Sequence, residues 1–266
     1  MSTIKFGIAA IGVVAHGMEN WREARLLLTS DTAYDAGQPL PKLAPSMLPA
    51  NERRRTTRLI KLALQCGQDA LDQWDGDANG LATVFASSGG DLEIVDRILT
   101  ALGMAGKPVS PTHFHNSVHN APAGYWSIAA QARAASTSLS AYDSSFAAGL
   151  LEAGSQVACD GTPTLLVAYD IPPPDTLMSF RPLVAPFGTA LMLVPADAAG
   201  VQAQLAVSVS REKASTLADE ALERLRNGNP AACVLPLLQS LAKQAAGTVQ
   251  LPYLSGQSIQ VEVTPC

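Results

Sequence analysis

Apolar positions along the chain recur with two different periods, one typical of strands and one typical of helices. Short apolar runs bounded by glycine or proline, which are typical of buried strands, cover residues 4–14, 81–86 and 163–170. Between the first two, residues 52–71 place apolar side chains on one helix face and arginine, lysine and glutamine on the other. This alternation predicts helices packed against a buried sheet, as in layered α/β proteins.

Weaker patterns predict the remaining elements. An amphipathic helix should run from Leu92 to Gly103, and a helix rich in alanine and glycine, at residues 146–158, should be buried on several sides. We expect neighbouring strands at residues 187–199 and 204–210, because a short connection joins them. Further strands are expected at residues 136–142 and around residues 249–263. Further helices are expected from about Pro122, at residues 213–227 and at residues 234–246.

The composition narrows the class of protein. Hydrophobic residues make up 47% of the 266 residues, which is enough to build a buried core. A net charge of −5 argues against binding of nucleic acid or anionic membranes driven by net charge. Met1–Val14 lacks the charged start and cleavage site of a signal peptide, and no segment has the ~20 apolar residues that span a bilayer. We therefore expect a cytoplasmic protein without a membrane span.

The four cysteines are scattered along the chain, without the close pairs that metal sites or redox motifs use. We therefore expect reduced thiols. Cys66, Cys159 and Cys233 stand among small apolar residues, which predicts structural burial, whereas Cys266 ends the chain and should be mobile. No cysteine is predicted to be catalytic.

Three histidines, His113, His115 and His119, have spacings of two and four residues, which are compatible with shared metal ligation. No suitable fourth ligand stands nearby in the sequence, so ring stacking and hydrogen bonding are the favoured roles. The Gly89–Gly90 turn could cradle a phosphate, but it lacks the rest of a P-loop or dinucleotide fingerprint, and a plain turn is favoured. We predict neither a metal nor a cofactor.

Four segments carry motifs that are more specific than the order of the elements. They are the helix with its Arg-Arg start at residues 52–71, the strand and Gly-Gly turn at residues 81–93, the pattern of Asn120, Ala123 and Gly124, and the strand at residues 187–199. Together they resemble the N-terminal half of β-ketoacyl synthases over residues 4–210. The resemblance implies an α/β, thiolase-like layered fold, truncated to about that half. Residues 1–210 would form this domain, with residues 211–266 as a short α+β extension packed on it.

The catalytic turn that this resemblance implies lacks its nucleophile. In an active synthase a strand delivers a cysteine at a sharp turn into a buried helix, whose N-terminus stabilises the thiolate. Counting without gaps from Asn120 places that position at Asp143, and a one-residue shift places it at Tyr142, with Ser144 adjacent. Aspartate is a poor substitute, because an acyl anhydride is far more labile than a thioester. The resemblance therefore implies a synthase-like turn without a catalytic residue.

The two catalytic histidines of the family, which polarise the incoming thioester, lie in its C-terminal half, and this chain has no histidine after His119. Too little chain follows residue 210 to build that half. The pattern HNSVHNAPAGYW, residues 115–126, resembles the short ketosynthase-like proteins of aryl-polyene and xanthomonadin-type pigment pathways. We therefore expect a non-catalytic, chain-length-factor-like partner that pairs with a full-length ketosynthase, as a heterodimer, in the elongation of polyene or fatty acyl chains on an acyl carrier protein.

Two groups of residues are candidates for contacts in such a complex. Residues 110–131 resemble the helix that forms much of the synthase dimer interface, and they should meet the ketosynthase and help to wall its acyl tunnel. The candidate interface and tunnel residues are Phe114, His115, Asn116, His119, Asn120, Tyr125 and Trp126. A basic helix face is most often only solvated, but it could dock an acidic acyl carrier protein. The candidate carrier-docking residues are Arg53, Arg54, Arg58 and Lys61.

Two alternatives are open at this stage. The chain could be an enzyme by itself that uses Ser144 or Asp143 in acyl transfer, hydrolysis or decarboxylation, although the sequence offers no recognisable histidine base. Capping of the following helix is the favoured role for Asp143. The chain could also be a structural homodimer that binds acyl groups.

Overall fold

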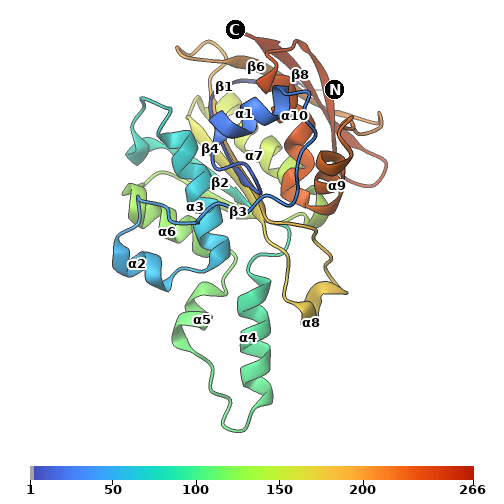
Figure 1. Cartoon of the computed structure of the whole chain (residues 1–266). Helices are drawn as coiled ribbons and strands as arrows, with labels where there is room; N and C mark the ends of the chain where they lie inside the picture. Colours follow the sequence, from blue (N-terminus) through green and yellow to red (C-terminus); the bar gives the residue numbers. More distant parts are fainter. Residues whose placement is uncertain (1–2) are drawn as a thin grey trace.

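The computed structural model describes residues 3–266 and is built on one eight-stranded mixed sheet (Figure 1). The strands are β1 (Ile4–Ala15), β2 (Ala82–Ala86), β3 (Ser136–Leu139), β4 (Thr164–Asp170), β5 (Phe187–Val194), β6 (Ala203–Ser210), β7 (Gly247–Pro252) and β8 (Ser258–Pro265). Their order across the sheet is β3-β2-β4-β5-β1-β6-β8-β7, with β2 parallel to β3 and β4. The carboxyl ends of these three parallel strands lie together, which is where α/β sheets usually carry their sites.

Helices cover both faces of the sheet and enclose two separate hydrophobic cores. On one face lie α3 (Arg58–Leu71) and α6 (Ala121–Ala130). On the other face lie α7 (Ser145–Asp160), α1 (Trp21–Thr29) and α10 (Leu235–Ala242). The predicted layering of helix, sheet and helix is confirmed, and α7 is buried as its small residues indicate.

The predicted helix at residues 52–71 is in fact two helices, α2 (Ala50–Arg55) and α3. They separate at Thr56 and Thr57, and the Thr57 hydroxyl accepts a hydrogen bond from the amide of Ile60 at 3.2 Å. A threonine that caps a new helix competes with continuation of the preceding one, and a hydrophobic period does not detect this. The prediction of a single helix is therefore wrong, whereas the apolar face of α3 is buried as predicted.

The strands β5 and β6 are not neighbours, so the prediction from their short connection is wrong. β1 lies between them and pairs with both. The connection crosses β1 closely, because the Gln202 amide donates to the Ile8 carbonyl at 2.7 Å, and a Cβ on Gly7 would lie 2.7 Å from Val201. A strand inserted from the distant N-terminus leaves no signal in the sequence of the connection.

Residues 211–266 continue the same sheet. β8 pairs with β6 from end to end, and β7 forms the edge. The first predicted helix is shorter, because Asp219 caps α9 (Glu220–Gly228) by accepting the amide of Leu222 at 2.8 Å. The second predicted helix, at residues 234–246, corresponds to α10, which ends earlier, at Ala242, and the 3₁₀ turn η3 (Pro230–Val234) precedes it. A division of the chain into two parts at residue 210 stays a prediction.

Three helices have no counterpart among the predicted elements: α1, α5 (Pro111–Asn116) and α8 (Asp175–Met178). The bounds of α4 (Leu92–Gly103) are confirmed, and the 3₁₀ turn η1 (Ala78–Gly80) precedes β2. α4 and α5 lie side by side and project from the sheet (Figure 1), and we call residues 92–116 the arm. Among the helices in residues 3–266, none combines the length and the apolar character that crossing a membrane requires.

Candidate functional site

The chain between β3 and α7 makes the sharp turn that the sequence predicts. The 3₁₀ turn η2 (Tyr142–Ser144) leads directly into α7. Tyr142 has a φ of 53°, in the left-handed region that residues other than glycine adopt rarely and at an energetic cost. The Ser145 hydroxyl holds this conformation by donating to the Tyr142 carbonyl at 2.7 Å and accepting from the Ala141 amide at 3.0 Å. We call residues 141–145 the elbow.

Asp143 does not cap α7, so that prediction is wrong. α7 begins without a side-chain capping bond, and the Asp143 carboxylate instead accepts a hydrogen bond from Arg181 Nη1 at 2.6 Å. The guanidinium carbon of Arg181 also lies 3.8 Å from the centre of the Tyr142 ring, a cation–π distance. The Asp143 side chain is 69% exposed and that of Arg181 only 11%. The carboxylate therefore lies at the surface, away from the free amides at the start of α7. Asp143 is thus engaged in an ion pair.

Ser144 is buried, and its hydroxyl donates to the carbonyl oxygen of Tyr253 at 2.8 Å. A carbonyl oxygen does not take up the hydroxyl proton, so this contact does not activate the serine as a nucleophile. The nearest histidine in the sequence, His119, has its Nε2 at 2.9 Å from the carbonyl oxygen of Leu139 instead. Ser144 therefore lacks, within residues 3–266, the hydrogen-bonded histidine base of a serine nucleophile.

A cavity of about 500 Å³ lies in front of the elbow, and we call it the elbow cavity. Its lining includes Tyr142 and Asp143 of the elbow together with Arg181, Arg226 and Cys233. Burial raises the pKa of the Cys233 thiol to about 12, which keeps it protonated and unreactive at neutral pH. Cys233 is therefore poorly suited to act as a nucleophile beside the elbow.

Labelling of the native protein with a maleimide tests this assignment of the thiols. Cys159 is exposed in the last turn of α7, off the apolar face of that helix, so the prediction of its burial is wrong, and Cys266 is exposed as well. Cys66 and Cys233 are buried, with pKa values raised by burial. We expect intact mass to show two labels on the folded protein and four after unfolding. Labelling of Cys233 in the folded state would contradict its burial beside the elbow.

A second carboxyl group, that of Asp170, lies at the buried end of β4. Its Oδ1 accepts hydrogen bonds from the amide and the hydroxyl of Ser88, both at 2.8 Å, and from the hydroxyl of Ser87 at 3.0 Å. Burial nevertheless raises the pKa of Asp170 to about 6. The Gly90 amide donates to Ser87 Oγ at 3.1 Å, so two amides of the Gly-Gly turn are bonded internally, which favours the plain turn over a phosphate cradle.

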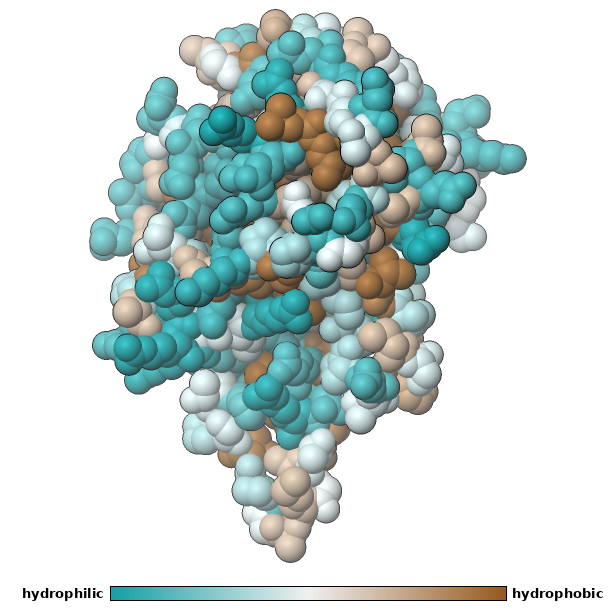
Figure 2. Space-filling model, in the orientation of Figure 1, coloured by the Kyte–Doolittle hydropathy of each residue, from teal (hydrophilic) through white to brown (hydrophobic). Residues whose placement is uncertain are grey.

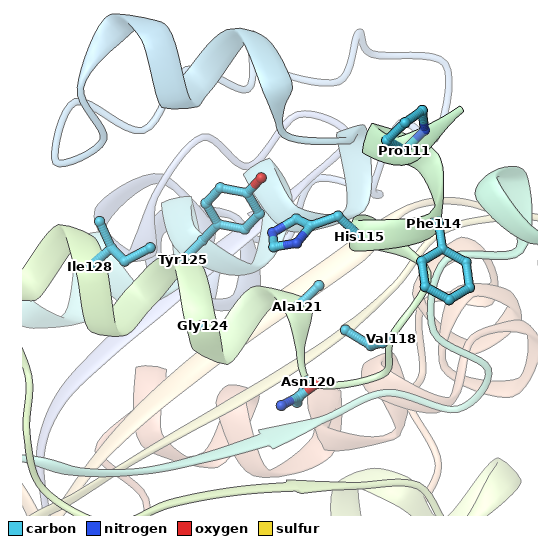
Figure 3. Close-up of a pocket in the computed structure, with 9 residues that line it drawn as sticks. All are labelled: Pro111, Phe114, His115, Val118, Asn120, Ala121, Gly124, Tyr125 and Ile128. Carbon is cyan, nitrogen blue, oxygen red and sulfur yellow. The ribbon is translucent and has the colours of Figure 1, made fainter. Parts of the chain in front are cut away.

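The predicted interface segment forms α5, α6 and the turn between them, and it carries a groove of about 470 Å³ (Figure 3). Four of the seven candidate interface residues line this groove: Phe114, His115, Asn120 and Tyr125. The rings of His115 and Tyr125 meet edge to face, with their centroids 6.1 Å apart. Phe114 is 68% exposed, so the groove presents an aromatic side chain to solvent.

The other three candidates in this segment point into the protein and support the groove from below. Asn116 is buried, and its amide donates to the carbonyl oxygen of Arg55 at 2.8 Å. Trp126 packs on α3, where a Cβ on Gly67 would lie 2.6 Å from the indole ring. His119 is held against β3. These three side chains fix the position of α5 and α6 and do not line the groove.

Five groove residues are absent from the sequence-based prediction: Pro111, Val118, Ala121, Gly124 and Ile128. A signal for them exists, because apolar residues occur at positions 114, 118, 121, 125 and 128, with the spacing of three and four that is typical of one helix face. The stripe crosses the break between α5 and α6, so its residues do not belong to one continuous helix. Ile128, at its end, is 61% exposed.

The arm extends the apolar surface away from the body of the protein. Leu99, Leu102 and Met104 on or after α4 are exposed, and α4 lies beside α5. Figure 2 shows mainly pale and tan residues at the tip of the projecting end, in contrast with the teal surface of the body. Exposed apolar surface of this kind is typical of protein interfaces.

The predicted basic face is divided between two helices, so the prediction of one continuous face is wrong. Arg53 is half-buried, and its guanidinium donates to the carbonyl oxygen of Pro45 at 3.2 Å. Arg54 and Arg58 line a concave surface of about 730 Å³, whereas Lys61 does not. Other basic residues on this surface are Arg55, Arg97 and His113. The structure therefore brings together two of the four predicted residues and adds new ones.

The histidines of the segment have separate environments. His115 lines the groove, His119 contacts β3, and His113 lies on the concave basic surface. In residues 3–266 no group of three or more histidine, cysteine, aspartate or glutamate side chains is arranged to hold a metal ion.

Three solved structures have similar folds. The first is the ketosynthase (ApeO) in complex with its chain length factor (ApeC) from Xenorhabdus doucetiae, with 24% sequence identity and a TM-score of 0.74. The second is the ishigamide ketosynthase/chain length factor, with 13% identity and a TM-score of 0.76. The third is the complex AntDE:AntF, a type II PKS acyl-carrier protein with its ketosynthase bound to the hexaketide, with 12% identity and a TM-score of 0.76. The matches cover 97%, 98% and 100% of this chain and 99%, 99% and 100% of the other chain. These likenesses confirm the thiolase-like layered fold.

A search of curated proteins finds no match. The family model for the N-terminal domain of β-ketoacyl synthases matches residues 20–253, which include the elbow, the groove and most of the sheet. The resemblance to the N-terminal half of ketosynthases is therefore confirmed, and the chain belongs to the β-ketoacyl synthase N-terminal domain family.

Proposed function

We propose that this chain is a non-catalytic, chain-length-factor-like partner of a full-length ketosynthase in the elongation of polyene or fatty acyl chains on an acyl carrier protein. The observation that carries the proposal is the open apolar groove on α5 and α6. The elbow, with Asp143 in an ion pair and Ser144 bonded to a carbonyl oxygen, supports a non-catalytic role. The similar solved structures include ketosynthases with a chain length factor, which supports the same type of partner.

The groove is continuous with a second feature that favours association. β3 lies at the edge of the sheet and contacts α6. The outer edge of such a strand has backbone amide and carbonyl groups that can pair with a strand of another chain. A partner that covers α6 and β3 together would bury the apolar side chains of the groove and continue the sheet.

We further propose that the groove walls part of the acyl tunnel of the complex. Gly124 faces the groove, and no heavy atom lies within 4 Å of the position that a Cβ would take. Its neighbours Ala121, Val118 and Ile128 are apolar. An acyl chain seated here would contact mainly carbon atoms, whose removal from water favours binding.

Replacement of Gly124 by phenylalanine tests this part of the proposal. The new ring would extend into open groove space without overlap inside the chain, so we expect an intact fold and a complex that makes shorter acyl products. Mass spectrometry of the released products measures the change, and Gly103→Phe, at the end of α4 where a Cβ also meets no atom within 4 Å, is the control. An unchanged product length in a stable Gly124→Phe complex would contradict the tunnel.

The concave basic surface is the candidate site for the carrier. Arg54, Arg55 and Arg58 approach one another there with Arg97, although Glu52 and Glu93 pair with two of these arginines. An acidic carrier protein would find a net positive surface at this place. One of the similar structures contains an acyl-carrier protein with its ketosynthase, which supports a carrier as a partner. We place the complex in the cytoplasm, in keeping with four free cysteines.

Co-expression with the full-length ketosynthase of the same pathway tests the proposed function. We expect the two chains to elute together, and condensation on the carrier protein to decline strongly when this chain is omitted. Separate elution, with activity and product length unchanged by the omission, would refute the proposal. A stable homodimer by native mass spectrometry would support the structural alternative, and an acyl adduct that is lost in Ser144→Ala would support the enzymatic one.

A further inference from the structure

Arg181 is bonded to one carboxylate, that of Asp143, and its charge also acts on a second one, that of Asp170. On the outer side its Nη1 donates to Asp143 at 2.6 Å, and its guanidinium lies over the Tyr142 ring. On the inner side, Nε and Nη2 of Arg181 and Oδ2 of Asp170 are buried without a hydrogen-bond partner. These are three of the six buried side-chain atoms without a partner in residues 3–266. Arg181 and Asn229 both line the elbow cavity, and the Asn229 side chain donates to the Asp170 carbonyl at 3.3 Å, so these unpaired atoms belong to the same part of the protein.

The charges of the two inner groups influence each other although the groups are not bonded. Burial raises the pKa of Asp170, and the positive charge of Arg181 lowers it in part. The outer pair, by contrast, involves a carboxylate that is 69% exposed, and water weakens such pairs. A buried acceptor that is left unpaired costs more than a typical hydrogen bond contributes. An inward turn of the guanidinium would exchange a weak outer pair for a stronger inner one.

We propose that Arg181 is a two-position latch of the elbow, paired with Asp143 in the closed position of this structure and with Asp170 when the guanidinium turns inward. In the inner position Nε and Nη2 would donate to Oδ2 of Asp170. Tyr142 then loses the cation that covers its ring, and the elbow cavity, which Arg181 and Tyr142 both line, changes its shape. The residue acts by positioning the elbow and has no catalytic role.

The segment that carries Arg181 is suited to such a movement. It is attached at one end where the Val184 amide donates to the Gly228 carbonyl at 3.0 Å, and at the other where the Thr176 hydroxyl donates to Asp96 at 2.6 Å. Asp96 belongs to α4, so the segment joins the elbow to the arm. Between these attachments, Arg181 can turn while the ends of the segment stay in place.

The charge of Asp170 selects the position. Asp170 accepts hydrogen bonds from the hydroxyls of Ser87 and Ser88, on the turn after β2. Its other neighbours are Tyr169 on β4, Asn229 after α9, Cys233 on η3, and Arg181. His119 lies beside Gly90, which belongs to the turn after β2. Burial raises the pKa values of the Tyr169 hydroxyl and the Cys233 thiol, so both stay uncharged near neutral pH. Below about pH 6 Asp170 is neutral and the outer pair is favoured, whereas above it the carboxylate attracts Arg181 inward.

Nuclear magnetic resonance of the arginine side-chain Nε–H groups tests the latch on the isolated chain. The Arg181 signal is identified by its loss in Arg181→Lys. We expect this signal to move between about pH 5 and about pH 7, roughly one unit on either side of the Asp170 titration. The midpoint should lie near the pKa of Asp170, about 6. Asp170→Asn should hold the signal at its low-pH position, and Asp143→Asn should shift the midpoint to lower pH, because the outer partner is lost.

Asp175→Asn, on the exposed face of α8 in the same segment, is the matched control and should leave the titration unchanged. His119→Gln is a second control, since a midpoint that disappears in this variant would assign the movement to the surroundings of His119 and overturn the latch. An Arg181 signal that is independent of pH, or that titrates equally in Asp143→Asn, would also overturn it. If Asp170→Asn fails to fold, the Asp143→Asn result still decides, because that position is exposed.

Discussion

Aspartate at both Phe114 and Ile128 is expected to abolish pairing with the ketosynthase and to leave the fold of this chain intact. The two side chains are 68% and 61% exposed at opposite ends of the groove, so their replacement removes little packing within the chain. In the proposed complex the same positions would be buried, and two unpaired carboxylates would lose their hydration there. We expect the affinity to fall at least 100-fold, or about 3 kcal/mol. Co-purification and analytical ultracentrifugation measure the loss.

Leu26→Asp is the matched control for this experiment. Leu26 is 65% exposed, but it lies on α1, on the face of the sheet opposite to α6. The control should therefore retain the complex. Equal losses in both proteins would point to a general effect of added charge, and a complex that survives Phe114→Asp with Ile128→Asp would place the partner on another surface.

Gly12→Ala is expected to destabilise the protein more than any surface substitution. Gly12 is in β1, where α3 passes so closely that a Cβ would overlap the carbonyl oxygen of Cys66 and would lie 3.0 Å from the amide nitrogen of Ala70. Both obstacles are backbone atoms, which cannot turn aside as a flexible side chain can. α3 cannot retreat as a whole, because its other contacts, including that of Cys66 with Gly188, hold it on the sheet.

We expect the free energy of unfolding of Gly12→Ala to fall by about 3 kcal/mol or more. Urea unfolding followed by tryptophan fluorescence measures this change. Gly80→Ala is the control, since a Cβ there meets no atom within 4 Å. If Gly12→Ala does not accumulate as a folded protein while Gly80→Ala does, the expectation is met, whereas equal stabilities would show that α3 can move away from β1.

The site could be predicted from the sequence only in part. The position of the elbow follows from counting along the chain, because the turn between β3 and α7 is a local feature. The partner of Asp143 does not follow, since Arg181 is 38 residues away and its preceding residues are dominated by proline. From its neighbours in the sequence, Asp143 is expected to cap α7. In the structure the preceding residue, Tyr142, has a left-handed conformation, and the Asp143 carboxylate is directed away from the helix.

The groove shows the same limit. Phe114, His115, Asn120 and Tyr125 were predicted as interface residues from their type and their motif, and the structure places all four on one surface. Asn116 and Trp126 have side chains of the same kinds but are buried, because they occupy the faces of α5 and α6 that contact the body of the protein, at Arg55 and Gly67. A hydrophobic period cannot assign a face across the break between α5 and α6.

The amino-acid sequence by itself determined the layered α/β class, the absence of a cysteine at the elbow and of any histidine after His119, and the strong amphipathic helices such as α4. These features depend on composition or on neighbours a few residues apart. Only the tertiary structure decided that β1 separates β5 from β6, that Arg181 pairs with Asp143, and that the groove opens on α5 and α6. Each of these depends on residues far apart in the chain, whose contacts are set by backbone pairing and by the packing of both cores at once.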